Sequence, residues 1–428
     1  MGATSTAVRR DALGNELAPG LPYARGAILA STEDDFRKLR TAWSHIRRRI
    51  ADSGPDAVFN FSGLEHGLPL EPAELRVAND FVAPALYFDR FRSAALDHLG
   101  GDPDRHDAAL FNRLTGATLA THLSLVEPGD VVVGVSRTYS HASVVRSCSY
   151  AGARLVETHS AEELDGVLAA GTDVALVVLT RLAVTYDLLP LGEIRRIVDL
   201  AHERGVPVYV DDAGGARVAP ALDGQPRALE LGVDVVGTGL DKYGVTGPRL
   251  GVLGGDAALV SRIRARGFEL GLEARPLLYP AAARSLEGST PERVRELRET
   301  SREIAEALRP RIGDRVHETA VISELRAEDI LTVALERAGL VNAPIVPYEA
   351  TSAVAMALVR DHGVITVQLV GLPPGTSSLM FKFVPPEELA RFGGADAYAA
   401  AIDDAIDGLA ATLGRPEEIR ELLLRPAA

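Results

Sequence analysis

The sequence predicts an α/β protein with a large domain built on a mostly parallel β-sheet, helices on both sheet faces, and a smaller C-terminal α+β domain. Between about residue 110 and residue 255, apolar runs of four to seven residues alternate with helical patterns, which is typical of a parallel sheet. The runs are apolar throughout, so their strands are expected to be buried on both faces. Beyond about residue 285, longer and more charged helical patterns replace the alternation.

The predicted elements begin with a lead and one helix. Residues 1–25 contain Gly and Pro without an apolar period, which predicts an unstructured segment. From residue 31 to residue 50, apolar residues recur at steps of three and four, which predicts an amphipathic helix. A short extended stretch at 59–64 and a helical region at 81–91 are expected to follow.

The central alternation supplies the sheet. The predicted strands are residues 131–135, 154–157, 174–179, 206–210, 234–236 and 250–253. The predicted helices are residues 115–125, 140–150, 161–170 and 191–203. Ligands bind at the carboxyl ends of the strands in sheets of this kind, so functional residues are expected there.

The C-terminal third is expected to form the small domain. Its predicted elements are a helix at 292–308, strands at 364–370 and 378–383 with a Pro-Pro-Gly turn between them, and a last helix at 397–413. The predicted organisation is a lead and helix (1–55), a large domain (56–285) and a small domain (286–428).

Composition excludes several classes of function. The net charge of −14 over 428 residues is the opposite of what a non-specific nucleic-acid binder needs. Cys148 is the single cysteine, so an intrachain disulfide is impossible, which fits a reducing cytoplasm. No apolar run is long enough to span a bilayer. A dinucleotide G-x-G-x-x-G turn, a Walker A motif and a metal-ligand spacing are also missing from the sequence.

Lysine is scarce in this chain. Of 45 basic residues only three are lysine, namely Lys38, Lys242 and Lys382. Arginine cannot form an imine because its guanidinium stays protonated and delocalised. Each lysine in this sequence is therefore a stronger candidate than usual for a residue whose primary amine takes part in chemistry.

The first chemical motif is the run Val-Tyr-Val-Asp-Asp-Ala-Gly-Gly at 208–215. In pyridoxal phosphate (PLP) enzymes a carboxylate holds the pyridine nitrogen protonated, so that the ring can accept electrons. Asp211 at a strand end suits this role, and the small Ala213 allows the ring to lie close to the backbone. The alternative is a strand-end aspartate that caps a turn.

The second motif is the glycine-rich run 237–248, which carries Lys242. Lys242 lies 31 positions after Asp211 (242 − 211), on a loop that follows a predicted strand. An imine with an aldehyde cofactor requires a lysine presented in this way, and glycines allow close approach. The alternative is a solvated loop lysine, which the scarcity of lysine and the upstream Asp211 make the weaker interpretation.

Two further segments follow predicted strands or open predicted helices. Thr115, Gly116 and Ala117 open a helix whose N–H groups and dipole favour a phosphate, unless Thr115 is a plain N-cap. Thr238 is a further candidate for the same phosphate. His141 follows the strand at 131–135 and is a candidate for stacking on the cofactor ring or relaying protons, the alternative being an exposed or helix-capping histidine.

The run Asp241-Lys242 followed by Gly-Pro-Arg-Leu-Gly at 247–251 resembles the lysine segment of the selenocysteine synthase (L-seryl-tRNA selenium transferase) family. The archaeal selenocysteine-synthase-like PLP proteins are similar in two further runs, Phe-Asn-Arg at 111–113 and His-Ala-Ser to Arg-Ser-Cys at 141–148. The segment 211–217 is similar to D-glucosaminate-6-phosphate ammonia-lyase. The resemblance covers roughly residues 55–270 and is weak in the C-terminal third.

This resemblance implies an aspartate-aminotransferase-like fold (PLP fold type I), with pyridoxal 5'-phosphate bound by the large domain. It places the cofactor on Lys242, with Asp211 at the pyridine nitrogen and His141 over the ring. It gives the phosphate to Thr115, Gly116 and Ala117, and a substrate carboxylate to Arg113. The fold commonly borrows pocket residues from a second subunit, so a homodimer or larger homo-oligomer is expected.

The implied activity is β-elimination or β-replacement on a small-molecule amino acid, through an imine between substrate and cofactor. An aminotransferase is the alternative, and a PLP-binding protein without turnover is a further one, because the same Lys–Asp pair serves many reactions. The acidic charge and the absence of a basic N-terminal module argue against a tRNA partner. The expected location is the cytoplasm.

Overall fold

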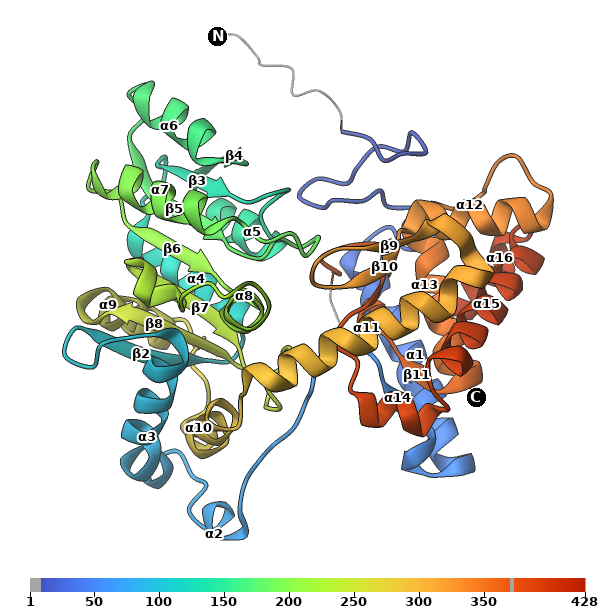
Figure 1. The fold of residues 1–428 in the computed structure, drawn as a ribbon, viewed down its shortest axis with the longest axis horizontal. Helices are drawn as coiled ribbons and strands as arrows, with labels where there is room; N and C mark the ends of the chain where they lie inside the picture. The colour runs from blue at the N-terminus through green and yellow to red at the C-terminus, as the bar shows by residue number, and fades with distance from the viewer. Residues whose placement is uncertain (1–8, 370–372, 428) are drawn as a thin grey trace. The chain divides into compact units, whose positions relative to one another are not determined.

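The computed structural model describes residues 9–369 and 373–427. The chain folds into two compact units. The sheet unit is Leu64–Arg295, and the helical unit combines the chain up to Gly63 with the chain from Glu296 onward. Figure 1 shows the elements of both units.

The sheet unit is built on one seven-stranded sheet with the order β2-β8-β7-β6-β5-β3-β4. Its strands are β2 (His106–Phe111), β3 (Val131–Val135), β4 (Arg154–Thr158), β5 (Val174–Thr180), β6 (Val208–Asp211), β7 (Val235–Gly239) and β8 (Gly251–Asp256). Strands β4, β3, β5, β6 and β7 are parallel, whereas β8 and β2 are antiparallel to their neighbours. The predicted, mostly parallel sheet is therefore confirmed, with β2 as an added edge strand.

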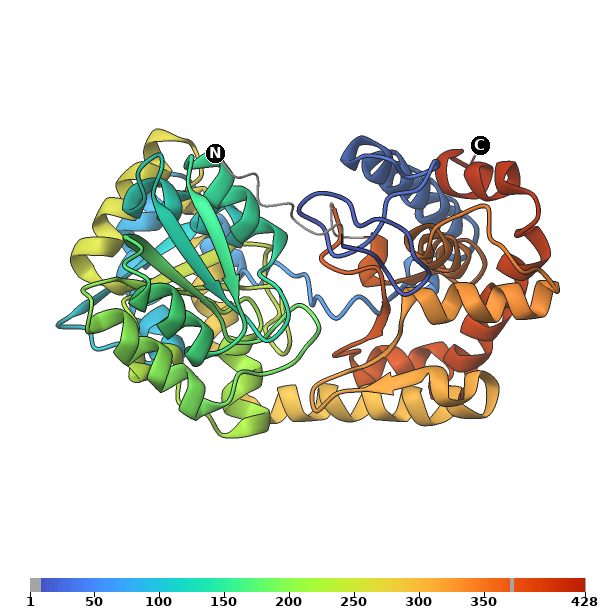
Figure 2. The same cartoon turned by 90° about the horizontal axis from the view of Figure 1, so that it is seen from above.

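Helices cover both faces of this sheet (Figures 1 and 2). Alternate residues of each strand point to opposite faces, so two separate apolar cores form. One core includes side chains of α3 (Val82–Leu99), α6 (Ala161–Ala169), α7 (Leu191–His202) and α10 (Tyr279–Glu287). The other includes side chains of α4 (Leu114–Leu125), α5 (Ala142–Tyr150) and α9 (Ala257–Glu269). The unit also contains α2 (Pro72–Leu75) and α8 (Gly215–Asp223).

The register of the central strands brings their carboxyl ends together. Thr180, the last residue of β5, pairs with Asp211, the last residue of β6. Asp211 in turn pairs with Gly237 of β7. The loops that leave these three parallel strands therefore start side by side at one edge of the sheet.

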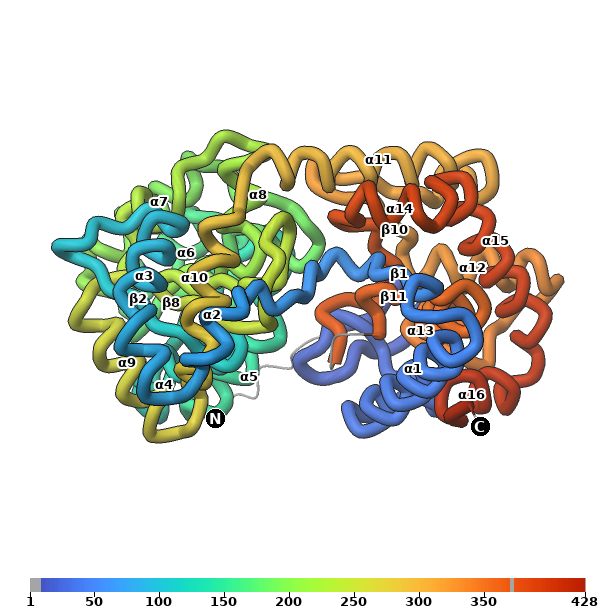
Figure 3. The backbone as a smooth tube through the Cα atoms, turned by 90° about the horizontal axis from the view of Figure 1, so that it is seen from below, coloured from blue at the N-terminus to red at the C-terminus, as the bar shows by residue number. Residues whose placement is uncertain are grey.

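The helical unit has one large apolar core and two small sheets. Its helices are α1 (Thr32–Ser53), α12 (Ala327–Ala338), α13 (Pro347–Ala357), α14 (Pro386–Phe392), α15 (Ala395–Thr412) and α16 (Pro416–Leu424), and α11 (Pro291–Ile312) belongs to it from Glu296 onward. Its strands are β1 (Phe59–Asn60), β9 (Val316–Glu318), β10 (Ser323–Leu325), β11 (Val364–Ile365) and β12 (Leu379–Phe381). Helix α1 lies beside α16 (Figure 3).

The N-terminal residues are part of this unit's core, which differs from the predicted three-part division. Tyr23, Ile28 and Leu29 are buried with side chains of α12, α13 and α15. Strand β1 pairs in parallel with β11, which lies in the C-terminal part of the chain. The predicted strand at 364–370 is interrupted, because β11 ends at Ile365 and a 3₁₀ turn follows at Val367–Leu369, while residue 370 lies outside the described residues.

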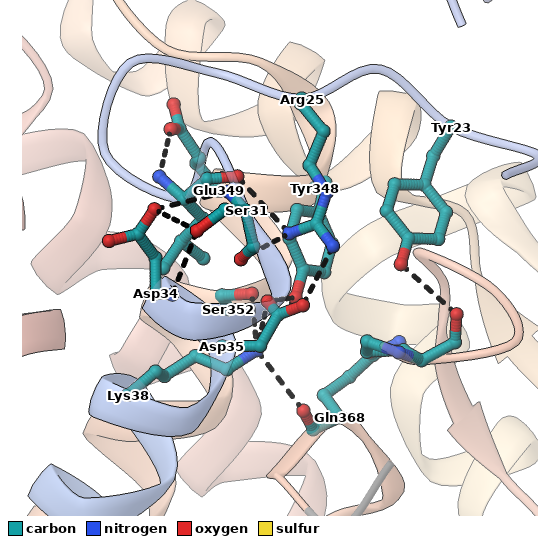
Figure 4. A network of polar contacts seen from close by, with 12 residues as sticks. Tyr23, Arg25, Ser31, Asp34, Asp35, Lys38, Tyr348, Glu349, Ser352 and Gln368 are labelled. Carbon is teal, nitrogen blue, oxygen red and sulfur yellow. Dashed lines mark hydrogen bonds and ion pairs between the residues drawn. The ribbon is translucent and has the colours of Figure 1, made fainter. Parts of the chain in front are cut away.

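A buried polar network ties the N-terminal segment to α1 and α13 (Figure 4). Lys38 is fully buried, and its Nζ donates to the Tyr348 hydroxyl at 2.9 Å and to the Gln368 carbonyl at 3.3 Å. Asp35, also fully buried, lies 3.9 Å from Lys38 Nζ and forms a 2.8 Å ion pair with Arg25. Burial lowers the pKa of Lys38 to about 8, although Asp35 opposes the shift.

This lowered pKa predicts a pH dependence of stability. The unfolded chain binds the Lys38 proton up to its ordinary pKa of 10.5, whereas the folded chain releases it near 8. The cost of the buried charge is therefore fully present below pH 8 and is lost as the pH rises toward 10.5. We expect the unfolding free energy of the wild type to rise through this window relative to Lys38→Met, as measured by urea unfolding. Parallel curves for the two proteins would contradict the buried charge.

Candidate functional site

Lys242 lies on the loop between β7 and β8. Leu240 N–H donates to the Leu250 carbonyl at 3.0 Å, so the loop closes on itself at its base. The Lys242 side chain retains 22% exposure, whereas Lys38 is fully buried and Lys382 is 5% exposed. Lys242 therefore has the most exposed side chain of the three lysines.

The charges around Lys242 act in opposite directions. Burial lowers the pKa of its amine, and the guanidinium groups of Arg249 and Arg217 lower it further. The carboxylates of Asp241 and Asp211 oppose this shift. A lowered pKa increases the fraction of the amine that is neutral, which is the form that acts as a nucleophile or a base.

Asp211 ends β6 with a buried side chain that is 4% exposed. Its Oδ1 atom has no hydrogen-bond partner among the described residues. Burial raises the pKa of this carboxyl to about 7, and the neighbouring Asp212 contributes in the same direction. A buried carboxylate oxygen without a donor is costly, so this atom is suited to a ligand that brings one.

The adjacent Asp212 is committed to a different role. Arg181 donates Nε to Asp212 Oδ1 at 3.1 Å and a terminal nitrogen to Oδ2 at 2.7 Å, and both residues are fully buried. This bidentate ion pair satisfies both oxygens of the Asp212 carboxylate. Of the two neighbouring aspartates, Asp211 is therefore the one whose carboxylate is suited to a ligand. The only sign of Arg181 in the sequence is its place directly after strand β5.

The small residues after these aspartates have specific neighbours. The Ala213 carbonyl accepts from Arg217 at 2.9 Å and from the Thr238 hydroxyl at 3.4 Å, which joins the loop after β6 to the last residues of strand β7 before its loop. A Cβ on Gly214 would collide with the Tyr243 ring. The glycine therefore makes room for the residue that follows Lys242, a contact that no sequence pattern records.

Helix α4 begins next to the strands that carry the lysine loop. A Cβ on Gly251 would lie 2.5 Å from the Leu114 nitrogen, so the first turn of α4 touches β8 directly. Thr115 and Gly116 lie in that turn, and buried Ala117 follows. The N-cap is Arg113, and no side chain among the described residues caps the helix, so the alternative role of Thr115 as N-cap is not what the structure has.

Arg113 carries its charge close to the lysine loop. Burial lowers the pKa of its guanidinium, Arg249 lowers it further, and Asp241 opposes the shift. These influences indicate that Arg113, Arg249 and Asp241 share one electrostatic environment with Lys242. The structure thus brings Lys242, Asp211, Thr238, Ala213 and the start of α4 to one edge of the sheet.

His141 is the N-cap residue of α5. Its Nδ1 accepts from the Ser143 N–H at 3.1 Å and lies 2.7 Å from the Ser143 hydroxyl. The structure therefore gives His141 the helix-capping role that the sequence left as an alternative. Its position over a cofactor ring stays a prediction.

Two tyrosines with unusual backbone conformations lie at this edge. Tyr186, in the loop after β5, has φ 65°, and Tyr243 has φ 51°. Their hydroxyl groups are hydrogen-bonded to each other, and both side chains are buried. Positive φ values are costly for such residues and gather at functional sites. The pair could not be predicted, because nothing in the sequence marks a tyrosine for positive φ.

Metal sites and membrane spans are not found in the described part of the chain. Within residues 9–369 and 373–427, no group of three or more His, Cys, Asp or Glu side chains is placed to hold a metal ion. None of the helices in the same ranges combines the length and apolarity that crossing a bilayer requires.

A family model and a sequence relative both match most of this chain. The family model described as aminotransferase class I and II matches residues 82–387. A UPF0425 pyridoxal phosphate-dependent protein of Methanothermobacter thermautotrophicus is 32% identical over 404 residues, which are 93% of this chain and all of the relative.

Solved structures show the fold. A serine palmitoyltransferase from S. paucimobilis has a TM-score of 0.56 at 18% identity, covering 81% of this chain and 86% of the other. An alanine–glyoxylate aminotransferase from Nostoc sp. has a TM-score of 0.57 at 16% identity, covering 82% and 95%. The predicted aminotransferase-like fold is confirmed by these likenesses, which at such identity carry no information about substrate.

Proposed function

The chain belongs to the aminotransferase class I and II family, and we propose that it is a PLP-dependent enzyme acting on a free amino acid, with Lys242 carrying the cofactor. The observation that carries the proposal is the pair formed by Lys242 and Asp211. At the carboxyl ends of the parallel strands, a lysine with a partly exposed side chain lies within electrostatic range of a buried carboxylate, one of whose oxygens has no hydrogen-bond partner among the described residues.

The residues present fit the cofactor. Asp211 Oδ1 lacks a donor among the described residues, and a protonated pyridine nitrogen would supply one. The N–H groups at the start of α4, around Thr115, Gly116 and Ala117, would hold the phosphate together with Thr238. Ala213 and His141 would lie against the ring in this proposal. When bound, PLP supplies a ring that stores the electron pair released from the substrate.

The chain's own groups perform the proton chemistry. The Lys242 amine, once neutral, accepts the proton from the α-carbon of the substrate. Asp211 must be ionised to hold a protonated nitrogen, and a positive donor beside it lowers the pKa that burial has raised to about 7. Arg113 would pair with the substrate carboxylate, because a guanidinium binds a carboxylate through two hydrogen bonds.

We propose β-elimination or β-replacement as the reaction. This choice rests on the resemblance of the lysine and aspartate segments to the selenocysteine synthase family and to D-glucosaminate-6-phosphate ammonia-lyase. An aminotransferase is the second candidate, favoured by the family match over residues 82–387. A PLP-binding protein without turnover is the third. The acidic net charge of −14 supports a small-molecule substrate rather than a nucleic acid. The proposed location is the cytoplasm, which the single cysteine supports.

The function is tested with purified protein loaded with PLP. We expect serine-, cysteine- or phosphoserine-type amino acids to release a keto acid, and Lys242→Arg to release none. Transfer of the amino group to an added keto acid, without loss of a β-substituent, would instead identify an aminotransferase. A cofactor spectrum that no amino acid changes would favour the protein without turnover.

We also propose that the chain forms a homodimer or a larger homo-oligomer. Support comes from large apolar side chains on and before α3, which are costly to leave in water. Phe81 is 88% exposed, and Leu75 and Leu86 are each 58% exposed. Sedimentation equilibrium tests this proposal, and the mass of a single chain at micromolar concentration would refute it.

A further inference from the structure

A short segment of the sheet unit, residues 64–67 (the clamp segment), contacts the lysine loop, residues 240–250, at several points. Leu64 forms a backbone bridge with Lys242, and His66 forms another with Gly247. Gly67 N–H donates to the Gly247 carbonyl at 3.0 Å, and Gly247 N–H donates to the Glu65 carbonyl at 3.1 Å. The loop is thus held at Lys242 itself and again five residues later.

Glu65 fixes the clamp segment from the side. Its Oε1 accepts from the Gly244 N–H at 3.1 Å, and its Oε2 pairs with Arg293 at 3.2 Å. Its side chain is 11% exposed, so these contacts are largely shielded from water. Lys242 is therefore presented by a loop whose backbone has little freedom.

The clamp segment also reaches the side chain beside Lys242. The two oxygens of Asp241 face different partners, and the carboxylate is 2% exposed. Oδ2 accepts from His66 Nε2 at 3.1 Å and forms a 3.7 Å ion pair with Arg249 Nε. Oδ1 lies 4.0 Å from Lys242 Nζ. His66 thus holds one oxygen of the carboxylate while the other faces the lysine amine.

We propose that His66 and Asp241 form a positioning pair for Lys242, in which the hydrogen bond from His66 keeps the Asp241 carboxylate turned toward the lysine amine. The inference rests on the proposed function, since it concerns the amine that would carry the cofactor. Neither residue needs to touch the substrate. Their role is to decide how strongly the amine is held as an ammonium.

The positioning pair acts on Lys242 through the charge of the Asp241 carboxylate. The charged or titratable groups that influence Asp241 are His66, Arg113, Arg217, Lys242, Tyr243 and Arg249. Burial alone would raise the pKa of the Asp241 carboxyl, but the cations around it keep the pKa low, so the group stays ionised.

Arginines compete with Lys242 for this carboxylate. Arg249 already lies on the Oδ2 side, and Arg113 and Arg217 lie within electrostatic range of the same group. Without the bond from His66, the carboxylate is expected to turn toward these arginines, which lowers its influence on the lysine amine. The groups that act directly on Lys242 are Asp241, Arg249, Arg217 and Asp211.

The scarcity of lysine makes a direct test possible in the full chain without cofactor. Lys38 is fully buried and Lys382 is 5% exposed, so labelling of the peptide that contains Lys242 by an amine-reactive reagent reports on Lys242 in the folded protein. This peptide is separate from the peptide with the reactive α-amino group. Mass spectrometry of the Lys242 peptide, at a series of pH values, gives the pKa of its amine from the labelling rate. Protection of Lys38 and Lys382 in the same samples shows that each variant is folded.

The expected results form a series. Asp241→Asn lowers the pKa of the Lys242 amine by about 1–2 units, because it removes the nearest opposite charge. His66→Phe lowers it by a smaller amount, roughly half a unit to one unit on the same scale. His66→Gln, which keeps an N–H donor, restores the wild-type value. In the Asp241→Asn background, His66→Phe has no further effect, because the two act as one unit.

A matched control is available in the same unit. His202 pairs with Asp234 at 2.9 Å, where the chain enters β7, at the end of that strand remote from the lysine loop. His202→Phe should leave the pKa of Lys242 unchanged. The inference is overturned if His66→Phe leaves the Lys242 pKa unchanged, or if its shift persists in the Asp241→Asn background.

Failure of the inference is separable from failure of the proposed function. The labelling experiment contains no cofactor, so it measures the positioning pair whether or not the protein binds PLP. Titration of wild-type protein with PLP, followed by its visible absorption, tests the function alone. If the labelling series is as expected but the protein does not bind PLP, the positioning pair is retained and the proposed enzyme is rejected. If the protein binds PLP but the labelling series is not as expected, the positioning pair is rejected.

Discussion

Replacing Lys242 by alanine is expected to abolish the covalent attachment of PLP and to reduce turnover by at least roughly 10²–10⁴-fold, the usual contribution of one acid–base group. The amine is the reactive atom, and the other two lysines are buried. Borohydride reduction followed by peptide mapping measures the attachment, and keto-acid release measures turnover.

The conservative variant Lys242→Arg separates the effect of the positive charge at this position from the ability to form an imine. Arginine keeps a cation beside Asp241, 4.0 Å away in the wild type, but it cannot form an imine. We expect Lys242→Arg to be as inactive as Lys242→Ala. The unfolding free energy should change by less than about 1 kcal/mol in both variants, because the Lys242 side chain is partly exposed and Asp241 keeps its contacts with His66 and Arg249. Cofactor trapped on Lys38 or Lys382 would show that the assignment of Lys242 is wrong.

The central sheet could be predicted from the sequence because its strands are apolar along their whole length. Strands β3 and β5, for example, lie within a residue of their predicted bounds. The sequence does not predict strand β2, because this strand begins with His106 and Asp107, which are only partly buried at the sheet edge. An antiparallel edge strand with a polar start lacks the continuous apolar run that marks a central parallel strand.

Long-range pairing is what the sequence could not supply. The burial of Tyr23 and Leu29 in the helical unit depends on contacts with segments far along the chain, such as the 3.0 Å bond from the Tyr23 hydroxyl to the Pro374 carbonyl, 351 positions later. No local pattern records such a contact. The same holds for β1, whose two residues pair with β11.

The residues of the candidate site also fall into two groups, those that a local sequence pattern predicts and those that depend on long-range contacts. The sequence identifies Asp211 and Lys242 because each has an informative side chain at or just after a strand end, and the fold brings strand ends together. It does not identify Arg181, His66 or Tyr186, because their importance comes from partners that only the folded chain provides. Asp241 is the neighbour of Lys242 in the sequence, but its role depends on which partners its two oxygens face, and only the folded chain shows this.

Replacing Asp211 by asparagine should lower activity and raise stability at the same time. The folded chain holds the Asp211 proton up to about pH 7, whereas the ordinary pKa of the group is 3.8. Burial of this carboxyl therefore costs stability that grows as the pH rises from about 4 to 7 and is fully present above 7. The asparagine removes this cost, so cofactor-free Asp211→Asn should be more stable than the wild type at pH 8, by at most about 4 kcal/mol.

Activity should move in the opposite direction. An asparagine cannot balance the charge of a protonated pyridine nitrogen, and losing a charged hydrogen bond of about 3 kcal/mol corresponds to roughly 100-fold in rate. We expect turnover of Asp211→Asn to fall by at least this factor, with the cofactor still attached to Lys242. Opposite changes in stability and activity are typical of residues retained for function rather than for folding.

The neighbouring aspartate provides the control for this experiment. Asp212→Asn breaks the fully buried pair with Arg181 and leaves the guanidinium without its counter-charge, which costs about 3–5 kcal/mol. The two substitutions therefore make the same chemical change at adjacent positions and are expected to alter the unfolding free energy in opposite directions. Urea unfolding of both variants at pH 8 measures the difference. A destabilised Asp211→Asn would indicate that Asp211 serves the fold instead of a ligand, because a carboxylate needed for folding cannot be neutralised at a gain.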